Sequence, residues 1–347
     1  AYQGVWSTAL ETLFADSTTR GAQRAEATSQ KFMLTLLATT AGPALALVLF
    51  LCIGDNWSLA ALKTVAVVGL ALCAPPALLL LGLRDVGADA CDDEEADKEG
   101  DEGIARLILV ADLISGFGSG MTVKFIPLFF KNRAGFSPVA ANALSIGAAL
   151  VMICGSRVCE RWSQSAGKAR VCAVCMVLAA IALIGLAWAD AGRLNVLRPG
   201  RPALTSTIKR AGAVLLYLLT CAQHACRPLK KAALNDHVPH ASRGRWNALD
   251  GVTRFGWSGS AVLGGYLVDR GGYALTFVVT AATQLIAALV WLALIGRVDP
   301  HAAGLVPRRR APTEDSLEEP LMEEAAPATR ATSGSFVVDD YSEMPRG

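Results

Sequence analysis

Residues 32–54 read FMLTLLATTAGPALALVLFLCIG and contain no charged side chain. A helix that crosses a membrane needs about 20 predominantly apolar residues, because the hydrocarbon layer is about 30 Å thick and each helical residue rises about 1.5 Å. This stretch is long enough to cross. It predicts a membrane-spanning helix, and it decides the class of the fold because comparable stretches recur along the chain.

Seven further apolar stretches predict spans, and the one at 255–268 reaches full length if residues 246–254 extend it. They cover residues 59–83, 107–130, 138–155, 171–189, 211–226, 255–268 and 271–296, and residues 5–15 resemble the end of another. Only helices and closed barrels satisfy every backbone group in lipid, and these stretches are too long and too uniformly apolar for barrel strands. We therefore predict an all-α, polytopic transmembrane helical bundle of about eight spans.

The composition agrees with a membrane protein. Hydrophobic residues make up 53% of the chain and charged residues 18%, whereas soluble domains carry about a quarter charged residues. The net charge of +2 gives no indication of nucleic-acid binding. These values exclude a soluble globular domain and a nucleic-acid partner as the first interpretations.

The charges between the spans predict which parts lie outside the bilayer. Residues 85–102 are strongly acidic and predict a disordered connector, and residues 298–347 predict a disordered tail. Lys and Arg residues are more numerous on the side of residues 20–31, with the basic loop 190–210 as an exception. The positive-inside rule therefore predicts a cytoplasmic C-terminus.

A weak internal repeat relates the two ends of the chain. Asp16, Arg24 and Gly42 are echoed by Asp236, Arg245 and Gly264, at spacings of 220, 221 and 222 residues. This near-constant offset places equivalent elements six helices apart. Parallel repeats of six helices are an architecture of secondary transporters.

Three motifs occur in an order typical of one transporter family. They are Gly42-Pro43 within a span, Gly155-Ser156-Arg157-Val158-Cys159-Glu160-Arg161 followed by Gly167-Lys168-Ala169-Arg170, and the small-residue stretch at 254–265. In this order they resemble the major facilitator superfamily. The resemblance implies that the spans are helices 5–12 of twelve, that residues 5–15 end helix 4, and that the N-terminus is truncated.

The resemblance implies four regions. Residues 1–83 are a partial N-terminal bundle, 84–103 an acidic cytoplasmic loop, 104–297 a complete six-helix C-terminal bundle and 298–347 the tail. The implied function is secondary active transport of a small solute by alternating access, coupled to an ion or proton gradient. The expected partners are this solute, protons and the lipid bilayer, the expected state is a monomer, and no cofactor is expected. The identity of the membrane stays open.

Two other classes of function stay open beside transport. One is a non-transporting membrane fragment or a sensor. The other is a membrane-embedded enzyme, for which Asp236, His237 and His240 are the nearest approach to a metal site. Their position in a loop of the repeat makes this the weakest of the three interpretations, so no catalytic or metal-binding residue is predicted.

Asp112 and Lys124 are the charged residues within the predicted span 107–130. A carboxylate there should face a water-filled cavity, pair with a cation or be protonated. For Asp112 two interpretations stay open: proton coupling or substrate contact, and an ion pair near the cytoplasmic mouth, since it lies only six residues beyond Arg106. Lys124 lies about 18 Å further along the helix, so it cannot pair with Asp112. It either snorkels outwards or lines a cavity.

Gln223, His224 and Arg227 form the polar cluster of the predicted span 211–226. They are neighbours at helical spacings of three and four residues, and Pro228 should bend the helix beside them. We predict that they line the transport cavity. The alternative for Arg227 is that it is only the first of the cytoplasmic cations that include Lys230 and Lys231.

Charged residues in the motifs are implied by the resemblance to act as gating latches without contacting solute. This set is Asp16, Arg24, Glu160, Arg161, Lys168 and Arg170. Asp250 and Arg254 are four residues apart on the predicted helix, so they can form an ion pair that is either a gate or only structural.

Small residues at four-residue spacing predict close helix packing. They are Gly116, Gly120, Gly256, Ser260 and Gly264, and we add the motif residues Gly42 and Pro43. Cys172 and Cys175 form a C-x-x-C in an uncharged span without a second ligand pair beside it, which favours a packing role over a metal or redox site.

Overall fold

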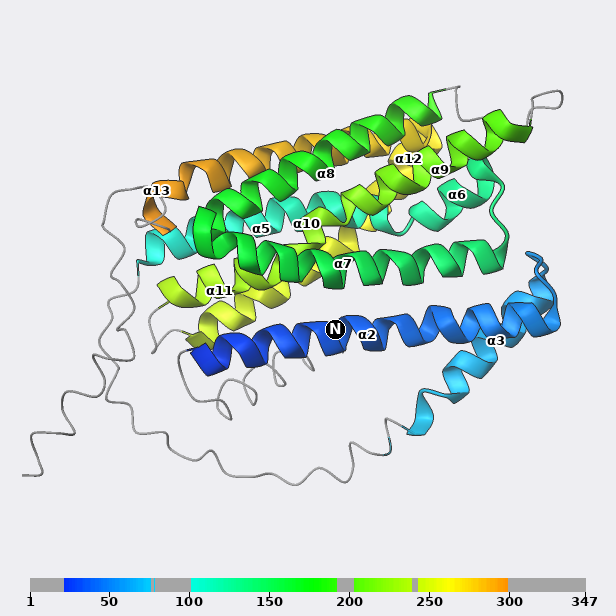
Figure 1. Cartoon of the computed structure of the whole chain (residues 1–347), viewed down its shortest axis with the longest axis horizontal. Helices are drawn as coiled ribbons and strands as arrows, with labels where there is room; N and C mark the ends of the chain where they lie inside the picture. The colour runs from blue at the N-terminus through cyan, green and yellow to red at the C-terminus, as the bar shows by residue number, and fades with distance from the viewer. Residues whose placement is uncertain (1–21, 76–77, 79–100, 192–202, 239–242, 299–347) are drawn as a thin grey trace, which may run out of the picture. The chain divides into compact units, whose positions relative to one another are not determined.

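Every regular element of the part of the chain that the computed structural model describes is a helix (Figure 1). The described residues are 22–75, 78, 101–191, 203–238 and 243–298. The predicted all-α class is confirmed. The helices are α2 (Ala22–Ile53), α3 (Leu59–Ala71), α5 (Glu102–Val123), α6 (Ile126–Ala134), α7 (Pro138–Ala166), α8 (Lys168–Asp190), α9 (Ala203–Thr220), α10 (Ala222–Ala225), α11 (Arg227–His237), α12 (Arg243–Ala293) and α13 (Ile295–Val298).

Five described helices are long and apolar enough to cross a membrane. They cover Gln30–Ile53, Glu102–Ala134, Pro138–Ala166, Lys168–Asp190 and Gly251–Ala293. The apolar helix α3 is shorter over its described residues, and the predicted span 211–226 lies in the broken run α9–α10–α11.

Helix α12 contains two of the predicted spans. Gly272 has φ 71°, outside the helical region, and interrupts the element. A Cβ added at Gly120 would touch Ser260 before this kink, and one added at Gly118 would touch Thr283 beyond it. Both halves of α12 therefore pack along the same part of α5. The chain turns back at Gly272, as the separate predicted spans 255–268 and 271–296 require.

The helices alternate in direction, so the structure has two ends (Figure 1). The end at which α7 stops and α8 begins, with the start of α5 and with α11, is called the Lys168 end. The opposite end, with the turn from α2 to α3 and the start of α7, is called the Trp57 end.

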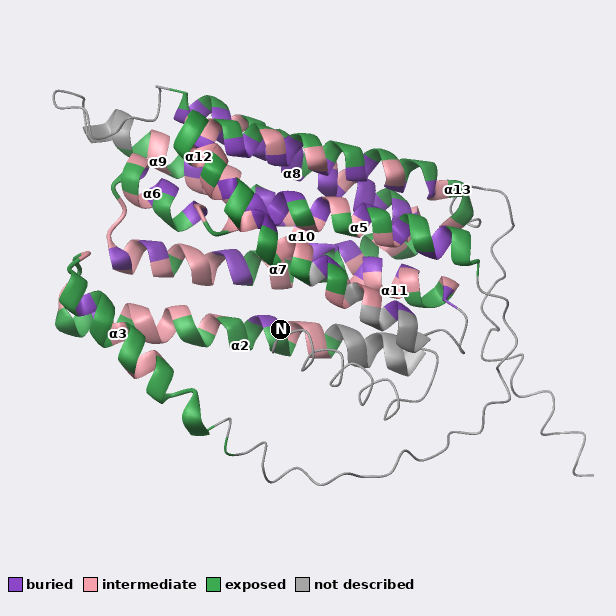
Figure 2. Ribbon diagram, turned by 180° about the vertical axis from the view of Figure 1, so that it is seen from behind, coloured by how far each residue is buried: buried purple, intermediate pink, exposed green. Residues whose placement is uncertain are grey.

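Exposed residues lie along the outer faces of the helices and buried residues lie where the helices pack together (Figure 2), and many of the exposed residues are large and apolar. Leu34, Leu70 and Val262 are each more than 60% exposed, whereas Ala179, Ala180 and Ala182 on α8 are fully buried. Water would oppose such an exposed surface and lipid would not. This distribution agrees with a bundle that faces hydrocarbon.

An ion pair joins three helices at the Trp57 end. Arg133 Nε lies 2.7 Å from Asp190 Oδ1, and the Asp190 side chain is 3% exposed. The second oxygen of Asp190 accepts a hydrogen bond of 3.0 Å from the backbone N–H of Ala274, just beyond the Gly272 kink. The carboxylate thereby satisfies a backbone N–H at the start of the second half of α12. It fixes the ends of α6 and α8 to the start of the second half of α12.

The packing glycines differ in what surrounds them. A Cβ at Gly120 would lie 2.0 Å from the carbonyl oxygen of Trp257 in the first half of α12, and one at Gly264 would lie 2.2 Å from the carbonyl oxygen of Met121 in α5. Gly116 and Gly256 leave ordinary contact distances of 4.0 and 3.4 Å, and no described atom lies within 4 Å of a Cβ at Gly42. The backbones of α5 and α12 thus approach closely at two glycines. Ser260 is also buried in this contact, and Pro43 lies inside α2.

Two predicted boundaries differ from the structure. The predicted span 107–130 divides at Lys124 and Phe125, just before Pro127, because proline lacks the N–H that would continue the α5 ladder. The motif at 155–161, interpreted as part of an interhelical loop, lies inside α7. Only Gly167, with φ 89°, joins α7 to α8, since glycine tolerates that conformation.

The acidic connector and the tail lie mostly outside the described residues. Of the connector, Asp101 and Glu102 are described and belong to the start of α5. Asp101 Oδ1 accepts hydrogen bonds from the backbone N–H groups of Gly103 at 2.9 Å and Ile104 at 3.2 Å. The end of the acidic stretch is therefore a helix cap.

Candidate functional site

Asp112 pairs with Lys230. The Lys230 Nζ lies 2.9 Å from Asp112 Oδ1, and the lysine side chain is 6% exposed while the aspartate side chain is 38% exposed. The two residues come from α5 and α11, which both lie toward the Lys168 end. A lysine so deeply buried requires a counter-charge. Asp112 supplies it.

The pair belongs to a longer polar chain. Lys230 Nζ also donates to Ser115 Oγ at 3.3 Å, and the backbone carbonyl of Ser115 accepts a hydrogen bond of 3.1 Å from Gln284 Nε2. Gln284 is fully buried in the second half of α12. The polar chain thus connects α11 and α5 to α12 through the interior of the bundle.

Arg106 is occupied elsewhere. It pairs with Glu102 at 2.8 Å, one turn earlier on α5, and both side chains are exposed. The buried partner of Asp112 is Lys230 and not Arg106, the nearest arginine in the sequence. Lys124 caps the C-terminal end of α5, where it is exposed and its Nζ lies 5.8 Å from the centre of the Trp257 ring.

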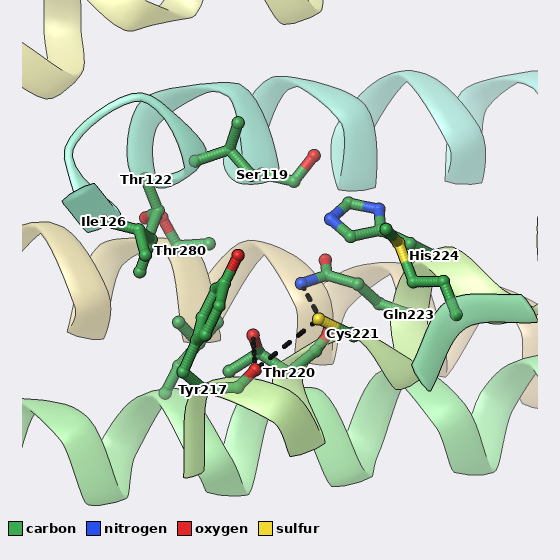
Figure 3. A pocket seen from close by; sticks show the side chains of 12 residues that line it. Ser119, Thr122, Ile126, Tyr217, Thr220, Cys221, Gln223, His224 and Thr280 are labelled. Atoms are coloured by element: carbon green, nitrogen blue, oxygen red, sulfur yellow. Dashed lines mark hydrogen bonds between the residues drawn. The ribbon is translucent and has the colours of Figure 1, made fainter. Parts of the chain in front are cut away.

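A cavity of about 90 Å³ lies in the middle of the described bundle (Figure 3). This is room for several water molecules or for part of a small solute. Hydroxyl, amide and imidazole groups line it beside apolar side chains, and none of the described lining residues is charged. They are Ser119, Thr122, Val123, Ile126, Met152, Leu183, Tyr217, Thr220, Cys221, Gln223, His224 and Thr280.

Breaks in the helix direct two of the predicted residues into this cavity. The run α9–α10–α11 is interrupted at Cys221 and at Cys226, just before Pro228. Gln223 and His224 lie between the breaks, and Figure 3 shows both side chains directed toward Ser119 across the cavity. Arg227 follows the second break, is exposed and does not line the cavity. The helical spacing that grouped these three residues therefore does not persist.

Internal hydrogen bonds hold the cavity wall. Gln223 Nε2 donates to the carbonyl oxygen of Thr220 at 3.1 Å, and Thr220 Oγ1 donates to that of Tyr217 at 2.6 Å. Across the cavity the hydroxyls of Thr122 and Thr280 lie 2.6 Å apart. Side chains from four segments are thus positioned before any solute arrives, which lowers the cost of binding.

The cavity and the ion pair are neighbours on α5. Ser119 lines the cavity and Ser115 bonds Lys230. These serines are four residues apart, so they share one helix face about 6 Å apart along the axis. A change at the ion pair is therefore one helical turn from the cavity.

A family model described as Major Facilitator Superfamily matches residues 2–228, more than half of the chain. The chain belongs to this superfamily. Searches of the curated proteins and of the solved structures each found no match. Members of the superfamily are membrane transporters of small solutes, and this chain is accordingly an integral, multi-pass protein of a transporter family.

Motif charges of this superfamily member meet at the Lys168 end. Lys168 Nζ lies 2.5 Å from Asp236 Oδ2, and this pair joins the start of α8 to α11. Glu160 lies 3.5 Å from Arg157, one turn away on α7. Arg161 and Arg170 are exposed. The structure thus brings Lys168 to a residue of the internal repeat that sequence reasoning had placed in a different motif.

The structure does not describe the side chains of four of the predicted latch residues. Asp16 is outside the described residues, and Arg24, Asp250 and Arg254 lie in helices whose side chains are not described at those positions. Their gating role stays a prediction.

Four cysteines gather where only two were predicted to be neighbours. Cys159 Sγ lies 3.6 Å from Cys175 Sγ, and Cys226 lies within side-chain hydrogen-bonding reach of Cys172 and Cys175. The interpretation that no second pair lies near the C-x-x-C is wrong, because α7 and α11 pack against α8. The described residues contain no group of three or more ligands arranged to hold a metal ion. His237 bonds the carbonyl oxygen of Ala233, and His240 lies outside the described residues.

Sequence reasoning missed the partner of Asp112. Lys230 was grouped with the cytoplasmic cations because Lys231 adjoins it and Arg227 precedes it. The sequence did hold one indication of this pairing. Asp112 lies near the start of the predicted span 107–130 and Lys230 just after the end of the span 211–226, so both lie near the same membrane face. Tyr217 and Thr280 were also missed, because a hydroxyl in an apolar span is common.

Proposed function

We propose that this protein is a secondary active transporter that binds its solute in the central cavity and couples transport to a change at the Asp112–Lys230 pair. The main support for this proposal is the ion pair with its buried lysine, which lies one helical turn from an uncharged polar cavity in a member of a transporter superfamily. Alternating access between two helical bundles would expose this cavity to each side in turn.

The lining of the cavity favours a small, uncharged, hydrogen-bonding solute or solute moiety. Its hydroxyls, the amide and the imidazole both donate and accept hydrogen bonds, whereas a formal charge would find no opposite charge among the described lining residues. The apolar side chains Val123, Ile126 and Leu183 would contact the non-polar part of the same molecule.

A proton offers the simplest coupling. Protonation of Asp112 would neutralise the carboxylate and leave the Lys230 ammonium without its counter-charge in a buried position. Lys230 would then move toward water or toward another acceptor, which would alter Ser115 and the helix face that carries Ser119. The partly exposed Asp112 is the member of the pair that a proton can reach.

Enlarging a cavity-lining side chain should block uptake. His224→Phe replaces an imidazole that hydrogen-bonds with an apolar ring of larger volume, so the solute loses both space and a polar partner. We expect the initial uptake rate to fall by about tenfold or more, the equivalent of about 1.4 kcal/mol of lost binding or transition-state stabilisation. The measurement is uptake into proteoliposomes, after a panel of radiolabelled sugars, polyols, amino acids and organic acids has identified a transported solute.

Leu215→Phe is the matched control. It introduces the same ring two turns earlier in the same run of helices, at a side chain that is 69% exposed on the outside of the bundle. Its uptake should equal that of the unmodified protein. Equal uptake by His224→Phe would show that the cavity is not the solute site.

The C-terminus is proposed to be cytoplasmic. The basic residues Arg157, Lys168 and Arg170 gather at the Lys168 end, which the positive-inside rule assigns to the cytoplasm. A peptide tag after Gly347 should then resist protease added outside sealed right-side-out vesicles and become sensitive after permeabilisation. Digestion of the tag in sealed vesicles would reverse the assignment.

A further inference from the structure

The turn between α2 and α3 reaches across to the start of α7. Asp55 Oδ1 accepts a hydrogen bond of 2.9 Å from the backbone N–H of Val139, and Trp57 Nε1 donates one of 3.0 Å to the carbonyl oxygen of Phe136. Lys131, in the last turn of α6, places its Nζ 4.7 Å from the centre of the Trp57 ring. Residues 55 and 57 thus make three different polar contacts, with α6, with the connection between α6 and α7, and with the start of α7.

Each contact has a physical reason. The first backbone N–H groups of a helix lack partners inside the helix, and the positive end of its dipole attracts a carboxylate. The Ser137 hydroxyl accepts a hydrogen bond from the backbone N–H of Ala140, and Asp55 accepts one from the neighbouring N–H of Val139, which Ser137 does not bond. The Lys131 cation is attracted to the face of the Trp57 ring.

The turn is held in a shape that presents these groups. Gly54 has φ 127°, a conformation that a side chain would disfavour, and it allows α2 to end abruptly. Asn56 Oδ1 accepts a hydrogen bond from the backbone N–H of Ser58, which in turn caps the start of α3. Asp55 and Trp57 therefore project from a defined turn.

These contacts are suited to repeated opening. Asp55 is exposed, and the Trp57 and Lys131 side chains are partly exposed, so water can replace each partner when the segments separate. Exposed polar contacts are individually weak, unlike the buried pair of Asp112 and Lys230. Three weak contacts acting together favour a closed arrangement without making it permanent.

The contacts also lie on the helices that form the cavity. Ile126, at the start of α6, lines the cavity five residues before Lys131, and Met152 of α7 lines it as well. Helix α2 packs along α7. A movement that separates the α2–α3 turn from α6 and α7 therefore acts on two walls of the cavity.

We propose that the turn of residues 54–58 is a reversible latch that closes the Trp57 end of the transporter, through Asp55 on the N-terminus of α7 and Trp57 between Phe136 and Lys131. This latch rests on the proposed function, since it closes the path to the proposed solute cavity. It gives the α2–α3 segment a defined role in access to that cavity.

Cys221 is a native reporter of this access, because its thiol lines the cavity and is free. The full chain is placed in sealed vesicles, a membrane-impermeant maleimide is added on the side of the Trp57 end, and modification of the peptide that contains Cys221 is followed by mass spectrometry. Opening the latch in Asp55→Ala/Trp57→Ala should raise the labelling rate about five- to tenfold, as expected when a closed population shifts toward an open one.

Two variants sharpen the test. Trp57→Phe keeps the ring beneath Lys131 and removes only the N–H that bonds Phe136, so its labelling rate should rise by about twofold and its fold should be retained. Asp269→Asn removes an exposed negative charge at the same end without touching the α2–α3 turn, and should label at the unmodified rate. Equal rates in the unmodified protein, Trp57→Phe and the double variant would overturn the latch.

The outcomes separate the latch from the proposed function. In one outcome Cys221 is labelled from the Lys168 side and is protected by a transported solute, while its labelling rate from the Trp57 side is unchanged in the latch variants. This outcome refutes the latch alone. Cys221 that resists labelling from both sides in every variant overturns the proposed solute path and the latch together.

Discussion

Asp112→Asn should abolish the pH dependence of uptake while leaving insertion in the membrane intact. The amide retains the shape of the side chain but cannot carry the proton or the negative charge. Lys230 then remains buried without a counter-charge. Breaking a fully buried ion pair costs about 3–5 kcal/mol, and we expect about 2–3 kcal/mol here because the Asp112 side chain is 38% exposed. The thermal midpoint in detergent should fall accordingly.

The measurement compares initial uptake rates across a pH series with thermal unfolding of the same purified variant. Glu102→Gln is the matched control, because it removes the carboxylate of an exposed ion pair, about three turns before Asp112 on α5. Exposed pairs contribute about 0–1 kcal/mol, so neither the pH profile nor the thermal midpoint of this control should change appreciably. A retained pH profile in Asp112→Asn would refute proton coupling through Asp112.

A second substitution separates coupling from stability. Asp112→Asn/Lys230→Met removes the stranded charge and replaces the lysine by an apolar side chain of similar length. Replacing both members of a buried pair is often neutral for stability, so the thermal midpoint should recover. Uptake should remain independent of pH, since the carboxylate proposed to carry the proton is gone. Recovery of pH-dependent uptake would show that the pair is only structural.

The spans were predictable because their physical requirement is local. A segment such as residues 32–54 shows its length and lack of charge in the sequence, and α2 covers it. The extension of the 255–268 span over residues 246–254 was anticipated too, and α12 begins at Arg243. The hydropathy of a segment therefore predicts a span directly, because each lipid-facing residue must itself be apolar.

Breaks and partners were less predictable because they depend on packing. The prolines at 127 and 228 mark the ends of α5 and α10, yet a proline within a span usually bends a helix without dividing it. Whether His224 and Arg227 share a surface depends on that outcome. Likewise, the partner of Asp112 depends on which of several cations α11 presents to α5. The shared membrane face limits the choice to the cations of that end, but the sequence alone does not single out Lys230, which lies 118 residues away.

Gly264→Ala should destabilise the bundle strongly although it adds one methyl group. The new Cβ would lie 2.2 Å from the carbonyl oxygen of Met121 and 2.9 Å from its carbonyl carbon. Both atoms belong to the backbone of α5, so no side-chain rotation relieves the overlap. The helices must separate, and a substitution that overfills a well-packed site typically costs about 1–3 kcal/mol. We expect the upper end of this range, together with poor yield of folded protein.

Gly259→Ala isolates the effect of packing from that of helix propensity. Both glycines lie in the first half of α12, and replacing either by alanine favours the helix by about 0.5–1 kcal/mol. No described atom lies within 4 Å of a Cβ at Gly259, so this variant should be as stable as the unmodified protein or more stable. The two thermal midpoints in detergent should therefore move in opposite directions. If Gly264→Ala were as stable as Gly259→Ala, the backbones of α5 and α12 would not be in close contact at Gly264.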